Sequence, residues 1–166
     1  LWSHYYLNNL DYAKILVLYY YREKLPLHWQ KQIIKCDKII FVYQLRIKFI
    51  NNINNIDELG EMINILVKNN ELYCFYTKII NCILKFKERV SLRRIKIILD
   101  TLNEQEIPIE ILEDTLDILA SNKNVKYSDI IMLEKLFNKI NMIKIKNILY
   151  SKIENPIDWT NYYLKY

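Results

Sequence analysis

The sequence contains very few of the residues that form tight turns. Gly60 is the only glycine, and there are three prolines in 166 residues. Sheet proteins depend on such residues, because many hairpin turns require glycine at positive φ. Phosphate-binding loops also need several glycines, so that backbone N–H groups can approach the phosphate. This scarcity excludes a phosphate loop and predicts an all-α fold of about eight helices joined by short polar loops.

Residues that build catalytic or metal sites are equally sparse. Cys36, Cys74 and Cys82 are odd in number and not closely spaced, which argues against a disulfide framework or a zinc site. Reduced, buried thiols in a cytosolic or matrix-like compartment are expected instead. His4 and His28 are the only histidines, and neither has a recognisable second ligand. We predict no catalytic residue, no metal, no cofactor and no small-molecule substrate, and therefore not an enzyme.

Long apolar runs are also missing. The longest, from Ile15 to Tyr21, has about seven residues, whereas a membrane-spanning helix needs roughly 20. No transmembrane segment is therefore predicted. The chain begins with Leu1 rather than methionine, which indicates a processed product or part of a longer chain, and no intact signal or transit segment is recognisable.

The abundant residues are isoleucine (29), lysine (19), asparagine (18) and tyrosine (14), which share AT-rich codons. This bias indicates an AT-rich genome rather than a function. The net charge of +5 is unevenly distributed, at +5 in residues 1–50, −4 in residues 51–121 and +4 in residues 122–166. Basic ends around an acidic middle do not describe a uniformly basic surface for nucleic acid.

Apolar residues at helical spacing divide the chain into three parts of one continuous domain. Residues 1–56 are predicted to form a helical pair, and its second helix carries an apolar stripe from Trp29 to Ile50. Residues 57–155 are predicted to form three helix–turn–helix repeats of about 36 residues. Residues 156–166 are predicted to form an aromatic tail. Because one helical pair cannot bury its own apolar faces, the repeats are expected to stack as a short array of antiparallel helical hairpins, an α-solenoid.

The repeat period comes from the predicted helix starts. The first helices of the pairs begin near Asp57, Ser91 and Ser128, and the second helices near Glu71, Pro108 and Ile143. Ser91 and Ser128 are predicted N-caps, and Pro108 suits a first helical position, where its missing N–H costs nothing. An asparagine is predicted to close each first helix, at Asn70, Asn103 and Asn141.

Residues 91–153 resemble the degenerate helical repeats of organellar RNA-binding proteins, the heptatricopeptide, octotricopeptide and pentatricopeptide families. The resemblance is carried by Ile97–Asn103, by Pro108–Leu119 and, less cleanly, by Leu136–Asn141. It is closest to the heptatricopeptide type, with an apolar pair, two spacers, an apolar residue and asparagine at the helix end. The resemblance implies an organellar location, with RNA as a partner or neighbour. We predict a mitochondrial location, with the cytoplasm as the alternative.

Two groups of side chains are candidates for contacts with partners. Basic residues that gather on one helix face and around the joints between helices are predicted to bind RNA phosphates: Lys31, Lys35, Lys38, Lys85, Lys87, Arg89, Arg93, Arg94, Lys96, Lys139, Lys144 and Lys146. A solvated basic face is the alternative. Aromatic residues near the two termini are predicted to dock neighbouring proteins, although burial within the fold is the alternative: Tyr5, Tyr6, Tyr19, Tyr20, Tyr21, Trp159, Tyr162 and Tyr163.

These features lead to two functional hypotheses. The first is a non-catalytic helical-repeat subunit of an organellar ribonucleoprotein, a mitochondrial ribosomal protein in contact with ribosomal RNA and with other proteins of a large assembly. The alternative is a protein–protein scaffold, or an accessory subunit of a mitochondrial membrane complex, without RNA contact. Salt dependence distinguishes them, because phosphate contacts weaken steeply as salt rises and apolar docking does not.

Overall fold

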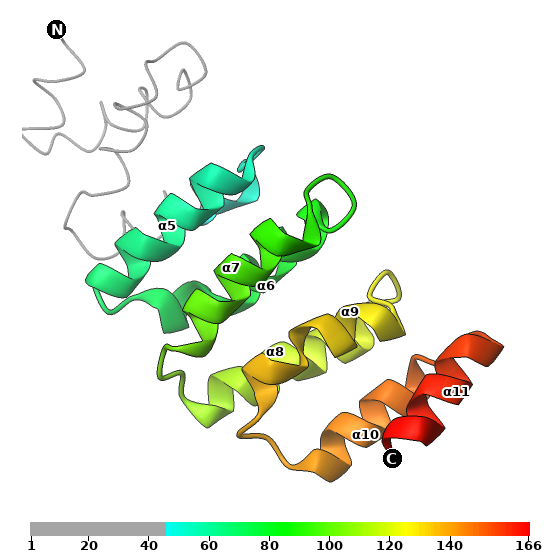
Figure 1. The fold of residues 1–166 in the computed structure, drawn as a ribbon. Helices are drawn as coiled ribbons and strands as arrows, with labels where there is room; N and C mark the ends of the chain where they lie inside the picture. The colour runs from blue at the N-terminus through cyan, green and yellow to red at the C-terminus, as the bar shows by residue number, and fades with distance from the viewer. Residues whose placement is uncertain (1–45) are drawn as a thin grey trace, which may run out of the picture. The chain divides into compact units, whose positions relative to one another are not determined.

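The computed structural model describes residues 46–166, and all regular structure in that range is helical, which confirms the all-α prediction there (Figure 1). None of its helices is both long and apolar enough to cross a membrane. After a helical segment at residues 46–51, the elements are α5 (Ile56–Lys68), α6 (Leu72–Phe86), α7 (Leu92–Asn103), α8 (Ile109–Ser121), α9 (Tyr127–Leu133), the 3-10 helix η2 (Glu134–Phe137), α10 (Met142–Ser151) and α11 (Pro156–Lys165).

The chain divides into two compact units, residues 1–68 and residues 69–166. In the first unit, Asn55 caps α5, because its side-chain oxygen accepts the backbone N–H groups of Asp57 at 2.8 Å and Glu58 at 3.2 Å. The predicted helices up to residue 45, and the predicted sites there, lie outside the described residues, whereas the end of the second predicted helix falls in the helical segment at residues 46–51.

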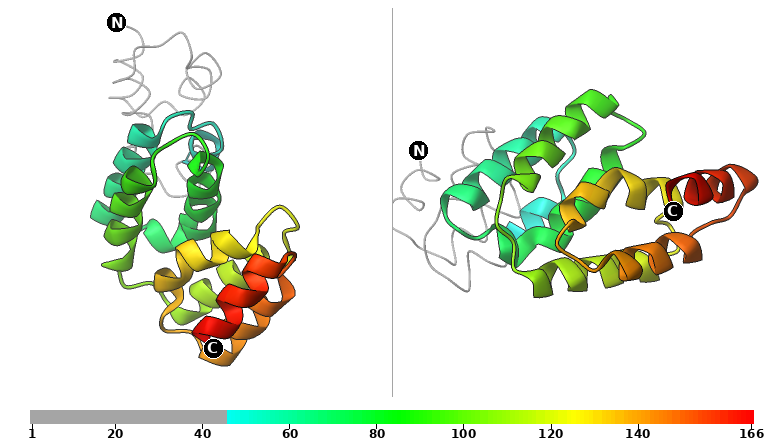
Figure 2. Two further views of the ribbon diagram at one scale, coloured as in Figure 1. Left: turned by 45° about the vertical axis from the view of Figure 1, so that its right-hand side comes forward. Right: turned by 60° about the horizontal axis from the view of Figure 1, so that its bottom comes forward.

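The second unit, which contains all the described candidate sites, has two layers of helices (Figure 2). In one layer α6 packs against α8, and Lys144 of α10 forms an ion pair with Asp117 of α8. In the other layer α7 packs against η2, and Glu134 of η2 accepts hydrogen bonds from Lys165 and Tyr166 at the end of α11. Consecutive helices run in opposite directions, so alternate joints lie at the same edge of the unit (Figure 1).

A hydroxyl pair crosses the layer formed by α6 and α8. Thr115 of α8 is fully buried, and its hydroxyl donates to the carbonyl of Ile111 at 2.7 Å. The Thr77 hydroxyl of α6 lies 2.7 Å from the Thr115 oxygen. Because the single hydroxyl proton of Thr115 is already used, Thr77 is the donor between the two helices. Around this pair the layer is apolar, with Ile79, Ile83 and Leu119 buried.

The observed helix starts lie within one residue of the predicted ones. Helices α5, α7 and α9 begin 36 and 35 residues apart, and α6, α8 and α10 begin 37 and 33 residues apart. Ser91 is the N-cap residue of α7, but its side chain makes no capping hydrogen bond. Pro108 precedes α8 as the N-cap residue instead of occupying the first helical position. Stacking of the pairs into a solenoid stays a prediction.

Three of the predicted helix ends differ from the structure. Asn141 opens α10, because its side-chain oxygen accepts the backbone N–H of Ile143 at 2.9 Å. Ser128 is not a cap, since α9 already begins at Tyr127. The boundary predicted between the repeats, which end at residue 155, and the aromatic tail is a helix start, because Asn155 and Pro156 open α11, with the Asn155 side chain accepting the Asp158 N–H at 2.9 Å. Pro156 fits because the first turn of a helix leaves its N–H groups unpaired.

Candidate functional site

Three joints of the second unit meet at one edge. Lys87, at the α6–α7 joint, donates to both carboxylate oxygens of Asp129 in the first turn of α9, at 2.9 and 2.8 Å. Lys126, at the α8–α9 joint, forms an ion pair with Glu154 at the α10–α11 joint over 3.3 Å. Lys152 donates to the carbonyl of Asn122 at 2.7 Å and joins the same two joints. Lysines therefore connect each joint of this edge to the next.

The Asp129 carboxylate is the best satisfied charge at this edge. It is 3% exposed, and besides Lys87 it accepts the backbone N–H of Lys126 at 2.8 Å. A buried carboxylate is stable only when it is paired and hydrogen-bonded, and Asp129 meets both conditions. Position 129 is also in the first turn of α9, where the helix dipole favours negative charge. Lys87 therefore has a structural partner within the fold.

Cations outnumber carboxylates at this edge. We call basic edge the cations of these three joints and of the helix turns that adjoin them: Lys85, Lys87, Arg89, Arg93, Arg94, Lys123, Lys126 and Lys152. Four carboxylates, Glu88, Asp129, Glu154 and Asp158, lie in the same segments. Burial lowers the pKa of the Lys152 ammonium, and the charge of Lys126 contributes in the same direction. Even so, the excess of positive charge makes this edge attractive to polyanions.

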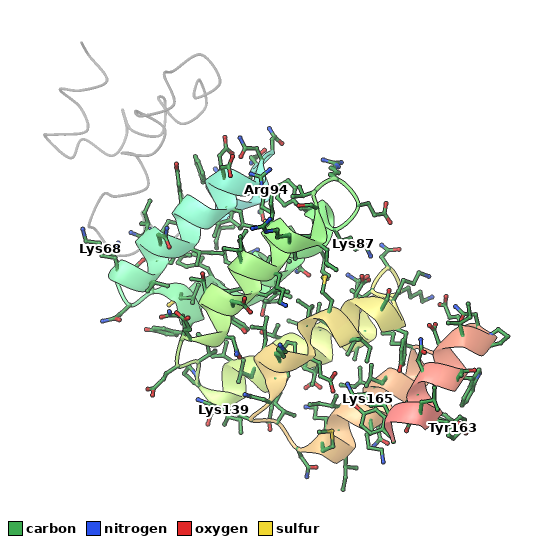
Figure 3. The ribbon with its side chains drawn as sticks, viewed as in Figure 1. Lys68, Lys87, Arg94, Lys139, Tyr163 and Lys165 are labelled. Carbon is green, nitrogen blue, oxygen red and sulfur yellow. The ribbon has the colours of Figure 1, made fainter. Side chains whose placement is uncertain are left out.

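The α7–α8 joint, at the opposite edge, is acidic. The α7–α8 joint carries Glu104 and Glu106, with Glu110 in the next turn, and all three are exposed. Lys139, from the joint between η2 and α10, lines a small pocket with Glu104 and Glu106, at the far end of the helices from Lys87 and Arg94 (Figure 3). The predicted phosphate contact Lys139 is therefore in an acidic environment.

The remaining predicted phosphate contacts are dispersed. Lys144 pairs with Asp117 at 2.9 Å, and the Lys146 ammonium lies 5.2 Å from the centre of the Tyr166 ring. Lys96 lies one turn after Arg93 on α7 and lines an apolar groove. The structure thus places Lys85, Lys87, Arg89, Arg93 and Arg94 at one edge with Lys96 next to them, and separates Lys139, Lys144 and Lys146 from this group. Lys31, Lys35 and Lys38 lie outside the described residues.

Sequence reasoning missed Lys123, Lys126 and Lys152 of the basic edge. They are separated by 30 or more residues from the cluster at positions 85–94. The signal that would have found them is topological, because in a chain of antiparallel helices every second turn returns to the same edge. Grouping basic residues by alternate turns rather than by nearness in sequence collects all of them.

The aromatic residues of the C-terminal segment mainly contact each other. Tyr150 of α10 has ring-centre distances of 5.1 Å to Trp159 and 5.8 Å to Tyr162 of α11, both in edge-on geometry. Trp159 stacks on Tyr163 at 5.7 Å. The predicted docking residues Trp159 and Tyr162 are half-buried in this cluster, whereas Tyr163 is exposed. Tyr5, Tyr6, Tyr19, Tyr20 and Tyr21 lie outside the described residues.

The chemistry of this surface is that of charge and packing. Within residues 46–166, no group of three or more histidine, cysteine, aspartate or glutamate side chains is placed to hold a metal ion. Burial raises the pKa of the Cys82 thiol, which keeps it protonated and unreactive at neutral pH.

Comparison of the chain with protein-family models, with curated proteins and with solved structures finds no match. The candidate function therefore depends on the basic edge itself.

Proposed function

We propose that the chain is a non-catalytic helical subunit of an organellar ribonucleoprotein, a mitochondrial ribosomal protein that contacts ribosomal RNA through its basic edge. The observation that supports this proposal most strongly is the gathering of cations from three joints along one edge of the second unit. The organellar location is supported by the resemblance of residues 91–153 to organellar helical repeats. The aromatic and apolar surface of α11 is proposed to contact neighbouring proteins.

The geometry of the basic edge suits a phosphate backbone. Packed helices lie roughly 8–10 Å apart, so successive joints present cations at a spacing that an RNA strand can follow. Arg89 and Lys123 are exposed, and their side chains have no partner within the described residues, so phosphate contact would not break an existing pair. Arginine also binds phosphate oxygens with two parallel hydrogen bonds. Such contacts would be independent of base sequence, because they involve the backbone alone.

Salt-dependent binding tests this proposal. The full chain would be titrated onto a fluorescein-labelled structured RNA at several salt concentrations, with fluorescence anisotropy as the measurement. The double variant Arg89→Gln/Lys123→Gln removes two charges from the basic edge. We expect the slope of log affinity against log salt to fall by about 1 to 2, because roughly one counterion is released for each phosphate contact.

The matched control removes two charges elsewhere. Lys135→Gln/Lys139→Gln lowers the net charge by the same amount, but neither residue belongs to the basic edge. The control is expected to keep the parental slope. Equal loss in both double variants would mean that net charge alone attracts the RNA and would contradict an RNA-binding edge. In cells, co-sedimentation of the tagged chain with a ribosomal subunit should be lost on ribonuclease treatment.

The second candidate is a protein–protein scaffold, or an accessory subunit of a mitochondrial membrane complex, without RNA contact. The observation that favours it is α11, in which no residue is buried and Leu164 is 82% exposed. Ile157 is on the same face, seven residues earlier, and is also exposed. Migration in a large complex that resists ribonuclease, together with RNA binding that the two double variants weaken equally, would support this candidate.

A further inference from the structure

An apolar groove of about 500 Å³ lies between α7 and the segment formed by α9 and η2. We call it the α7–η2 groove. Its lining includes Leu99 of α7, Ile131 of α9, Leu136 of η2 and Ile145 of α10. Leu136 and Ile145 are buried, and Leu99 and Ile131 are half-buried. All the lining residues belong to the second unit, so the groove is a feature of that unit alone.

The groove is elongated along α7. Its α7 side is formed by Leu92, Lys96, Leu99 and Asn103, which are three or four residues apart and therefore form one stripe along the helix. From Leu92 to Asn103 the helix rises by about 16 Å, the length of three turns. Leu92 begins α7 at the basic edge and is 69% exposed, whereas Met142 begins α10 at the opposite edge and is 53% exposed. The groove thus has an exposed apolar side chain at each end.

Some of the charged side chains that line the groove already have partners in the fold, and others do not. Lys96 and Lys135 line it, and neither has a hydrogen-bond or ion-pair partner in residues 46–166. Glu134, which also lines it, is already held by Lys165 and by the Tyr166 hydroxyl at 3.1 Å. Asp100 is the one other carboxylate in the lining. Two cations and a single carboxylate are therefore available to a molecule in the groove.

We propose that the α7–η2 groove binds an amphipathic helix of a partner protein, whose apolar stripe is flanked by acidic side chains. A helix is the occupant that matches a straight apolar groove three turns long with apolar side chains at both ends. Acidic flanks are required because Lys96 and Lys135 would otherwise stay without partners at the rim of a buried interface. The proposal goes beyond RNA contact, and it assigns to Lys96 a role other than phosphate binding.

Designed peptides test this proposal. The probe is a fluorescein-labelled, helix-stabilised peptide of about 15 residues, with leucines at i, i+3 and i+7 spacing and glutamates on both flanks. A matched peptide carries lysines in place of the glutamates. Anisotropy titration of the full chain should show binding of the acidic peptide, with affinity about tenfold above that of the basic one. This ratio is what two surface ion pairs of modest strength produce together.

A charge swap on the protein gives the decisive result. The variant Lys96→Glu/Lys135→Glu should reverse the preference, so that the basic peptide binds more tightly than the acidic one. Lys123→Glu/Lys139→Glu carries the same change of charge away from the groove and should keep the parental preference. No binding of the acidic peptide, equal binding of both peptides, or a preference that the swap does not move would overturn the proposal. The RNA salt slope of Arg89→Gln/Lys123→Gln measures the basic edge separately, so the two proposals can fail independently.

Discussion

At the scale of single residues, two acidic side chains form ion pairs that contribute differently to the free energy of unfolding. Asp129 is 3% exposed and holds Lys87 and a backbone N–H, so removing its carboxylate leaves a partly desolvated ammonium and an unpaired N–H. Asp117 also pairs with a lysine, Lys144, at 2.9 Å, but its side chain is 61% exposed. Water and salt can replace the partner of an exposed charge, and cannot do so for a buried one.

We therefore expect Asp129→Ala to lower the free energy of unfolding by about 2–3 kcal/mol, somewhat less than for a fully buried pair because Lys87 keeps some contact with water. Asp117→Ala is the control and should cost less than about 1 kcal/mol. Urea unfolding followed by circular dichroism at neutral pH measures both. Equal losses in the two variants would contradict a distinction based on burial.

In contrast to the Asp129 carboxylate, the Tyr127 hydroxyl is a buried polar group whose removal should not lower stability. Within residues 46–166 it is the buried polar side-chain atom that lacks a hydrogen-bond partner. Burial raises the pKa of this hydroxyl, and the nearby carboxylates of Asp158 and Glu134 add to the effect. Desolvating a hydroxyl without a partner is unfavourable, so Tyr127→Phe should leave stability unchanged or raise it by about 1 kcal/mol in urea unfolding. A clear loss of stability would mean that the hydroxyl has a partner in solution.

At the scale of helices, asparagine has three different roles at helix termini. Asn70 adopts a left-handed conformation, with φ of 54°, after the end of α5. Asn103 is the last residue of α7, and Asn141 is the N-cap of α10. The sequence pattern showed where the chain leaves the first two of these helices, because asparagine competes for backbone hydrogen bonds in helices, but the third helical segment already ends at Phe137. The pattern did not show whether the residue ends one helix or begins the next, since that depends on where the next apolar stripe finds its neighbours.

The cap role of Asn141 leads to a measurable cost. Asn141→Ala removes the acceptor for the Ile143 N–H and should lower the free energy of unfolding by about 1 kcal/mol. Asn147→Ala, an exposed change in the same helix, should leave stability unchanged or raise it by a few tenths of a kcal/mol, because alanine is the better helix former. Thermal unfolding of both variants gives the comparison. A larger cost for Asn147→Ala than for Asn141→Ala would exclude the cap.

The start of α9 shows what local patterns miss. Ser128 was a reasonable cap by residue type, but the α9 first turn is fixed by Asp129, which accepts the N–H of Lys126 and the ammonium of Lys87. Lys87 is 42 residues away in the sequence. The hydrogen bond from Lys126 is local, but the ion pair with Lys87 joins two joints, and no window of neighbouring residues contains it. The change from α9 to the 3-10 geometry of η2 has no counterpart in the sequence pattern either.

At the scale of the whole described structure, the apolar spacing was enough to predict the helices but not the surface. Burial follows from a 3.6-residue period, which each segment carries by itself. The basic edge follows from the direction in which each helix runs, and this is a property of the set of joints. Lys139 and Arg89 look alike in sequence, yet one lies beside Glu104 and the other among cations.

Alkali should unfold the second unit through its tyrosines. Burial and the charge of Glu134 raise the pKa of Tyr166 to about 12, and burial raises that of Tyr76 above its ordinary value as well. In the unfolded chain these hydroxyls lose their protons near pH 10. Between pH 10 and 12 the unfolded state therefore releases protons first, so stability is complete below about pH 10 and is lost as pH rises towards 12.

The variant Tyr166→Phe should show a shallower loss of stability between pH 10 and 12 than the parent, as measured by urea unfolding at each pH. Tyr163→Phe changes an exposed tyrosine of the same helix and should follow the parental curve. If Tyr166→Phe and the parent lose stability in parallel, then proton release from Tyr166 does not contribute to alkaline unfolding.

The aromatic cluster between α10 and α11 also has an optical consequence. Trp159 lies 5.1 Å from the ring of Tyr150 and 5.7 Å from that of Tyr163, so light absorbed by these tyrosines is passed to the indole and emitted there. After Trp2 and Trp29 are replaced by phenylalanine, tryptophan emission comes from Trp159 alone. The part of this emission that comes from Tyr150 of α10 then reports whether α11 rests on α10, because Tyr163 is in the same helix as Trp159. A partner that lifts α11 or covers it would change the signal without any added dye.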